Sequence, residues 1–96
     1  MTDSKIESQA LDTRRRRLLF RAWHRGIREM DLILGRFADA HIAQFTDAEL
    51  DLFERLIEVP DPELFAWVTG AASPPPGDDS AVFRRLRDFQ VQQAER

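Results

Sequence analysis

Residues 23–31, which decide the fold of this chain, read WHRGIREMD. Gly26 is the first glycine of the chain and follows an apolar and basic stretch with helical periodicity. Glycine adopts positive φ readily, so the backbone is expected to reverse at this point. Arg25 is then displayed at the bend, and Glu29 and Asp31 fall in the first turns of the next helix, where the helix dipole favours carboxylates. The stretch predicts a helical hairpin whose turn is recognised by a partner. An ordinary helix stop with capping charges is the alternative interpretation.

Helical periodicity extends from this turn in both directions, and no alternating β-branched run marks a strand. A first helix is expected from a cap at Asp12 or Thr13 to about Trp23, with an apolar stripe made by Leu18, Leu19, Ala22 and Trp23. The helix after Gly26 is predicted to be the central one, because its apolar positions form a wide arc: Met30, Leu32, Ile33, Leu34, Phe37, His41 and Ile42.

Three further helices follow from local signals. Residues 46–49 read TDAE, the form of a capping box, and open a third helix with an apolar face of Leu50, Phe53, Leu56 and Ile57. Asp61 is expected to cap a fourth helix that ends at Gly70 and carries Leu64, Phe65, Trp67 and Val68. Residues 71–79 hold three successive prolines and predict a polyproline-like link. Asp79 or Ser80 then caps a last helix, which packs through Val82, Phe83, Leu86 and Phe89.

The predicted fold class is therefore all-α, a compact five-helix bundle in a single domain. At 96 residues the chain has room for one modest core and no second unit. Its expected parts are a flexible N-terminal tail (1–11), a four-helix core with the Gly26 turn (12–70), the proline-rich link (71–79) and a C-terminal helix of the same domain (80–96).

Composition excludes several classes of protein. The chain has no cysteine, which rules out disulfides, a thiol nucleophile and cysteine-ligated metals, and fits a reducing compartment. No stretch approaches the roughly 20 apolar residues of a membrane span, so no membrane insertion is expected. Residues 1–13 carry three acidic residues and resemble neither a secretory signal nor a transit peptide.

Charge is segregated along the chain more strongly than the net charge of −3 suggests. Residues 14–36 hold eight arginines against Glu29 and Asp31, a balance of +6, whereas residues 37–64 hold eight acidic residues against Arg55, a balance of −7. If the fold keeps these segments on different faces, the resulting basic and acidic surfaces would orient a protein partner. Alternatively, adjacent helices neutralise each other's exposed faces.

The residues offer little for catalysis or metal binding. His24 and His41 have no third ligand at a recognisable spacing, and Glu29 and Asp31 diverge by about 200° on a helix, which is wrong for a shared carboxylate pair. No glycine loop that could cradle phosphates is present, so we expect a non-enzyme with no catalytic, cofactor-binding or metal-binding residues of its own. The run Arg14-Arg15-Arg16-Arg17 would suit nucleic acid, but the overall acidity favours a solvated helix face.

The motif Arg25-Gly26-x-x-Glu29-x-Asp31, followed by LILGRF at residues 32–37, resembles the signature of the succinate dehydrogenase assembly factor 2 family. These are small bacterial and mitochondrial flavinylation factors. Two later patterns also look like the family's third and fourth helices: Leu50-x-x-Phe53-x-x-Leu56-Ile57 and Pro60-Asp61-x-x-Leu64-x-x-Trp67. The resemblance spans about residues 14–70. Many members carry Arg-Arg-Gly where this chain has His24-Arg25-Gly26, so no role of the preceding arginine is transferred here.

The resemblance implies an assembly factor that binds the flavoprotein subunit of succinate dehydrogenase and, as a further client, that of fumarate reductase. It would promote covalent attachment of FAD to a client histidine. Both FAD and the acceptor histidine belong to the client, so His24 is not that acceptor. Carried over by position, Arg25, Gly26 and Glu29 would form the interaction surface, with Asp31 as a weaker member. The implied location is the bacterial cytoplasm, or the mitochondrial matrix in a eukaryote.

Two alternatives from other classes stay open on the sequence alone. A generic helical adaptor for another protein would keep the charge segregation and make the Arg25-Gly26 motif incidental. A small nucleic-acid-binding protein would use the run of arginines at 14–17.

Overall fold

The structure, a computed structural model, describes residues 11–94 and consists there of helices joined by short connections. The α-helices are α2 (Thr13–Trp23), α3 (Arg28–His41), α4 (Asp47–Ile57), α5 (Asp61–Thr69) and α6 (Ala81–Ala94), with short 3-10 helices η1 (Ile42–Gln44) and η2 (Pro76–Asp78). The prediction of an all-α, five-helix, single-domain fold is confirmed. The predicted tail, residues 1–11, lies outside the described residues except for Leu11.

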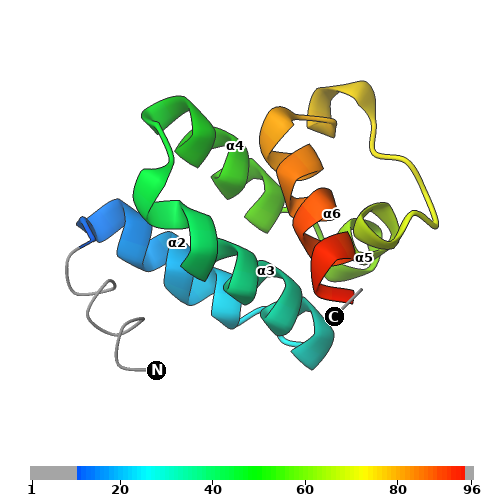
Figure 1. The fold of residues 1–96 in the computed structure, drawn as a ribbon, viewed down its shortest axis with the longest axis horizontal. Coiled ribbons are helices and arrows are strands. Elements are labelled where there is room, and N and C mark those ends of the chain that lie inside the picture. Colours follow the sequence, from blue (N-terminus) through cyan, green and yellow to red (C-terminus); the bar gives the residue numbers. More distant parts are fainter. Residues whose placement is uncertain (1–10, 95–96) are drawn as a thin grey trace.

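The helices enclose one apolar core. The Cα atoms of the chain have a radius of gyration of 12.7 Å. Figure 1 shows α2 beside α3, and α6 passing over α3 and α5. Phe37 of α3 occupies the middle of the core, because its ring lies within about 6 Å of the rings of Phe45, Phe53 and Phe89. The predicted apolar face of α4 is confirmed, since Leu50, Phe53, Leu56 and Ile57 are all buried. None of the described helices is both long and apolar enough to cross a membrane.

Most predicted helix ends are also confirmed. Asp12 caps α2 by accepting from the backbone N–H of Arg15 at 2.8 Å. Thr46 and Glu49 form the reciprocal capping box at the start of α4, with distances of 2.8 and 3.1 Å. Ser80 caps α6, and Gly70 ends α5 in the left-handed conformation at φ +86°. Local side-chain chemistry therefore defines these boundaries.

The predictions for α5 and the following link need correction. Asp61 is not the cap of α5 but its first residue, and Pro60 stands at the cap position without a side-chain hydrogen bond. Phe65 is not a core residue, since 39% of its surface is exposed. The link is not extended throughout, because Pro76–Asp78 forms η2 and Arg55 donates to Asp78 Oδ1 at 2.9 Å. A local sequence pattern could not show these tertiary contacts.

The arginine run divides into two pairs with different environments. Arg14 bridges α2 to α4 by contacting Asp51 at 2.6 Å and Glu54 at 3.2 Å. Arg15 donates to the backbone carbonyls of Ile42 and Phe45, while Arg16 and Arg17 remain exposed. The prediction of a solvated helix face therefore holds for Arg16 and Arg17 only. The contacts of Arg14 also show that the basic segment on α2 and the acidic segment on α4 partly neutralise each other.

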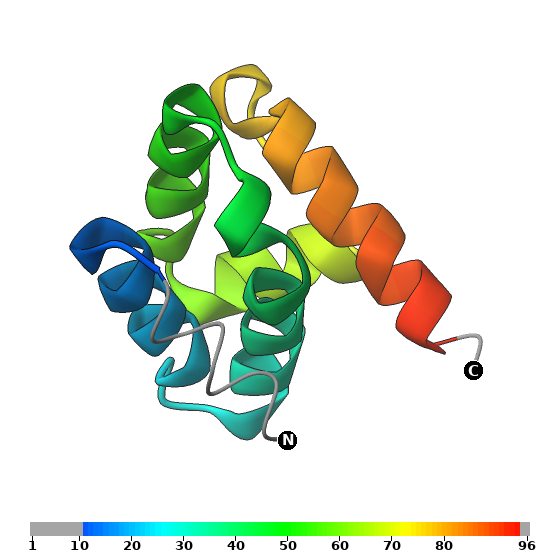
Figure 2. The ribbon, with the colours of Figure 1, turned by 60° about the vertical axis from the view of Figure 1, so that its left-hand side comes forward.

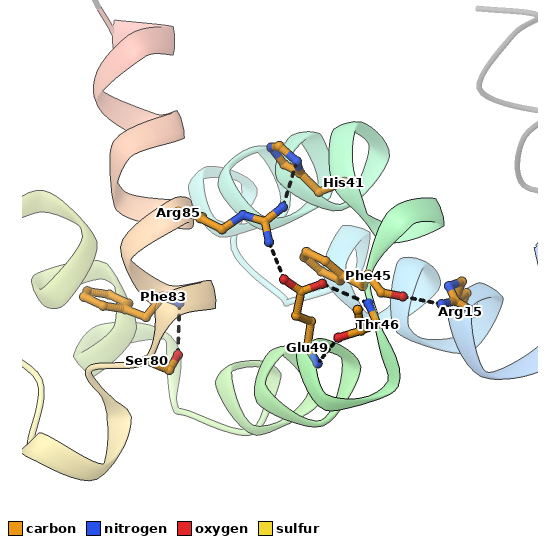
Figure 3. Close-up of polar contacts among 8 residues, drawn as sticks. All are labelled: Arg15, His41, Phe45, Thr46, Glu49, Ser80, Phe83 and Arg85. Atoms are coloured by element: carbon orange, nitrogen blue, oxygen red, sulfur yellow. Dashed lines mark hydrogen bonds and ion pairs between the residues drawn. The ribbon is translucent and has the colours of Figure 1, made fainter.

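A polar cluster connects α6 to the end of α3 and the start of α4 (Figure 3). Arg85 Nη1 donates to Glu49 Oε2 at 2.8 Å, and Arg85 Nη2 lies 3.5 Å from His41 Nδ1. Burial and the charge of Arg85 lower the pKa of His41 below its ordinary value of 6.5. The half-buried imidazole is therefore held in its neutral form beside the guanidinium.

Candidate functional site

The turn between α2 and α3, residues 24–27, exposes main chain at its tip. We call it the Gly26 turn. Gly26 has φ +111°, a value that disfavours any residue with a Cβ. Apart from its two chain neighbours, no residue of the described part of the chain comes within 4 Å of a Cβ built on Gly26, so the space beside the glycine is open there. The positive φ explains why a glycine occupies position 26. The open space leaves the backbone of Gly26 accessible to another molecule.

The side chain of Arg25 points into the protein, so the prediction that it is displayed at the bend is wrong. Only 9% of this side chain is exposed, and the guanidinium lies 2.8 Å from Asp61 Oδ1. It also donates to the carbonyl of Ile57 and, at 2.6 Å, to that of Val59. These carbonyls at the end of α4 lack intrahelical partners and carry partial negative charge, which attracts the cation. Arg25 therefore fastens the turn to α4 and α5.

Asp31 fixes the same turn from the other side. Its Oδ1 accepts a hydrogen bond from the backbone N–H of Arg25 at 2.5 Å, and the residue is half-buried. The structure thus brings Arg25 and Asp31 together around Gly26. Their charged groups are already engaged within the chain and hold the backbone in one conformation.

Glu29 is the predicted site residue whose charge is free to contact a partner. It is exposed in the first turn of α3, and it has no hydrogen bond or ion pair with another described side chain. The neighbouring Ile27 exposes 44% of its surface. The outer face of the turn therefore combines bare main chain at Gly26, an apolar side chain and one carboxylate.

Trp23, at the end of α2 just before the Gly26 turn, packs on Gly35 of α3. The sequence did not predict this contact. A Cβ on Gly35 would lie only 2.2 Å from Trp23 Cδ2, so the indole packs directly on the glycine backbone. Trp23 Nε1 also donates to Asp39 Oδ1 at 3.3 Å. The signal available in the sequence was Gly35 inside the apolar pattern of the predicted second helix, since such a glycine often permits close packing.

The two histidines lie in different surroundings. His24 is exposed, its Nδ1 is 2.7 Å from the Phe20 carbonyl oxygen, and its ring stacks on Phe20 at 3.9 Å. His41 belongs to the polar cluster with Arg85. Within residues 11–94, no three His, Cys, Asp or Glu side chains are grouped as they would be around a metal ion.

The chain is similar in sequence to known proteins. A family model described as flavinator of succinate dehydrogenase matches residues 16–90. This match covers the Gly26 turn and reaches into α6, beyond the predicted resemblance over 14–70. "FAD assembly factor SdhE" of Acetobacter pasteurianus is 40% identical over 83 residues, which make up 86% of this chain and 76% of that protein.

Similarity extends to proteins named as mitochondrial. "Succinate dehydrogenase assembly factor 2, mitochondrial" of Scheffersomyces stipitis is 35% identical over 88 residues, or 88% of this chain. The protein of the same name in Caenorhabditis elegans is 30% identical over 92 residues, which cover 93% of this chain and 77% of that protein. The chain spans 59% of the length of the Scheffersomyces relative.

Proposed function

Because this chain belongs to the family of flavinators of succinate dehydrogenase, we propose that it binds the flavoprotein subunit of that enzyme. Through this contact it promotes covalent attachment of FAD to a histidine of the client. The flavoprotein of fumarate reductase is a further client under the same proposal. The place of action is where the client matures, in the bacterial cytoplasm or the mitochondrial matrix.

The observation that carries this proposal is the open and firmly held main chain at Gly26. Arg25 and Asp31 fix the turn through buried and half-buried contacts, while within residues 11–94 only chain neighbours approach the position of a Gly26 Cβ within 4 Å. A preorganised surface loses little conformational entropy on binding, so more of the contact energy appears as affinity. Glu29 adds a carboxylate for a charge-assisted hydrogen bond to the client.

In this proposal the chain acts by binding, and the bond-forming chemistry belongs to the client. The charged groups of Arg25 and Asp31 are occupied within the chain, and Glu29 stands alone on the outer face. Binding to one arrangement of the client's FAD-bearing and capping regions raises the population of that arrangement. Correct placement of FAD against the acceptor histidine then accelerates self-catalysed bond formation by the client.

The test compares Gly26→Arg with Gly70→Arg. Both glycines are exposed, have positive φ and have open space at the Cβ position among the described residues, so each substitution puts a side chain at positive φ without a steric clash. Each variant is co-expressed with a succinate dehydrogenase flavoprotein subunit in cells that lack their own factor. Covalent flavin is measured by in-gel fluorescence, and helicity by circular dichroism. We expect Gly26→Arg to abolish covalent flavin and Gly70→Arg to retain it.

Glu29→Ala is the second variant of this test. It removes an exposed carboxylate without a partner in the described chain, so we expect lower covalent flavin with unchanged helicity. Parental flavin levels in both Gly26→Arg and Glu29→Ala would contradict the assignment of this surface. Equal loss in Gly26→Arg and Gly70→Arg would mean that strain in the fold, rather than a blocked contact, causes the defect.

A further inference from the structure

A groove adjoins the Gly26 turn between α3, α5 and the last turns of α6. It has a volume of about 260 Å³, and the side chains that matter here are Glu29, Leu32, Arg36, Phe65, Gln90 and Gln93. Figure 2 shows α6, in orange and red, running away from α3 toward its C-terminal end. Glu29 belongs both to the outer face of the turn and to the groove, so the two surfaces are continuous.

Phe65 gives the groove an apolar contact point. Its ring is 39% exposed, although the other large apolar residues of α5, namely Leu64, Trp67 and Val68, are buried. Leu32 from α3 is half-buried and lines the same groove. Aromatic side chains in such positions are frequent anchors of protein interfaces, because a partner can desolvate them at little entropic cost.

The charges of the groove favour a peptide over an anionic cofactor. Glu29 and Arg36 are seven residues apart on α3, so they share a face and are separated by about 10 Å along the helix axis. Neither forms an ion pair with another residue in the described part of the chain. Their opposite charges cancel, and a flavin pyrophosphate would therefore meet no net positive field. Gln90 and Gln93 offer amide donors and acceptors that match peptide groups.

We infer that this groove binds a short extended segment of the client flavoprotein, with an apolar side chain against Phe65 and Leu32. A basic residue of the segment faces Glu29, and an acidic residue faces Arg36. The separation of the two charges corresponds to about three residues of extended chain. This inference rests on the proposed function and adds to it the surface and the kind of client segment.

The first arm of the test compares two exposed apolar side chains. Val91, on α6, is 49% exposed and does not line the groove, so Val91→Ala is the control for Phe65→Ala. Biolayer interferometry measures the Kd of each variant for the purified succinate dehydrogenase flavoprotein subunit. We expect Phe65→Ala to raise Kd about tenfold or more, as loss of an interface anchor does, and Val91→Ala to leave it within about twofold.

The second arm uses charge and does not depend on the packing of Phe65. Arg36 and Arg16 are both exposed, but only Arg36 lines the groove. We expect Arg36→Glu to raise Kd about tenfold, since it places like charge opposite an acidic client residue, while Arg16→Glu has a smaller effect. If the parent binds and both Phe65→Ala and Arg36→Glu bind equally well, the groove assignment is overturned and the proposed function stands. If the parent fails to bind, both are overturned.

Discussion

Two corners of the molecule reverse the chain, and both are held by an arginine that donates to main-chain carbonyls. At the Gly26 turn between α2 and α3, Arg25 donates to Ile57 and Val59. At the corner between α3 and α4, residues 42–46, Arg15 donates to Ile42 and Phe45. The same side-chain chemistry thus satisfies carbonyls that lack helical partners at each corner.

The two corners differ in what covers their main chain. In the second, Ile42 and Phe45 are buried and Thr46 caps α4, so apolar packing and capping add to the arginine contacts (Figure 3). At the Gly26 turn the tip is exposed and Gly26 has open space around it. The residues of the first corner are therefore held mainly by the polar contacts of Arg25 and Asp31, with Trp23 packed on Gly35 beside them. A corner built in this way leaves its backbone free to meet a partner.

The largest expected effect that tests this comparison is that of Arg25→Ala. The substitution leaves Asp61 and two carbonyls without their cationic donor in a site where the arginine is only 9% exposed. Breaking such a buried pair destabilises proteins by about 3 kcal/mol or more. We expect a loss of this size in the unfolding free energy measured by urea titration, together with loss of client binding.

Arg28→Ala is the matched control, because Arg28 is exposed one residue after the Gly26 turn. It should change the unfolding free energy by less than about 0.5 kcal/mol. Adding Asp61→Ala to Arg25→Ala should recover part of the lost stability, since it removes the unpaired carboxylate. If Arg25→Ala is as stable as the parent, polar contacts do not hold this corner.

The corner between α3 and α4, residues 42–46, is called the packed corner here. We expect Arg15→Ala, which removes its arginine contacts, to lower the unfolding free energy less than Arg25→Ala does. The side chain of Arg15 is 19% exposed, and water can partly replace it at the Ile42 and Phe45 carbonyls. Hydrogen bonds that involve a charged group contribute about 1.5–3 kcal/mol, and the access of water to Arg15 places the expected loss near the lower end of this range. Urea titration should show a loss in this range, with client binding retained in the folded protein. A loss equal to that of Arg25→Ala would remove the distinction between the two corners.

The smallest expected effect is a pH dependence of the unfolding free energy that arises from His41, beside the packed corner. The folded state lowers the pKa of His41 from 6.5, chiefly through burial and then through Arg85. On acidification the unfolded chain therefore binds the proton first, and stability falls as the pH drops below about 6.5 until the folded-state pKa is passed. His41→Gln should flatten this part of the stability profile between pH 8 and pH 5. An unchanged profile would show that His41 does not contribute to it.

Much of the fold was predictable because its signals are local. The capping box at Thr46 and Glu49, the stop at Gly70 and the apolar face of α4 each depend on residues within a few positions of one another. The turn at Gly26 was predictable for the same reason, since its positive φ is a property of glycine itself. Glu29, which the family resemblance assigned to the interaction surface, is exposed at the start of α3.

What the sequence by itself determined is the set of helices, the turn and the family motif. Only the tertiary structure decided which members of that motif face outward. Arg25 turns inward because the end of α4 and Asp61, more than 30 positions away, supply acceptors that no local pattern reveals. Phe65 stays exposed because it lines an open groove between α3, α5 and α6, which no pattern local to α5 reveals. Local spacing fixes helices, whereas the direction of each side chain depends on neighbours brought together by folding.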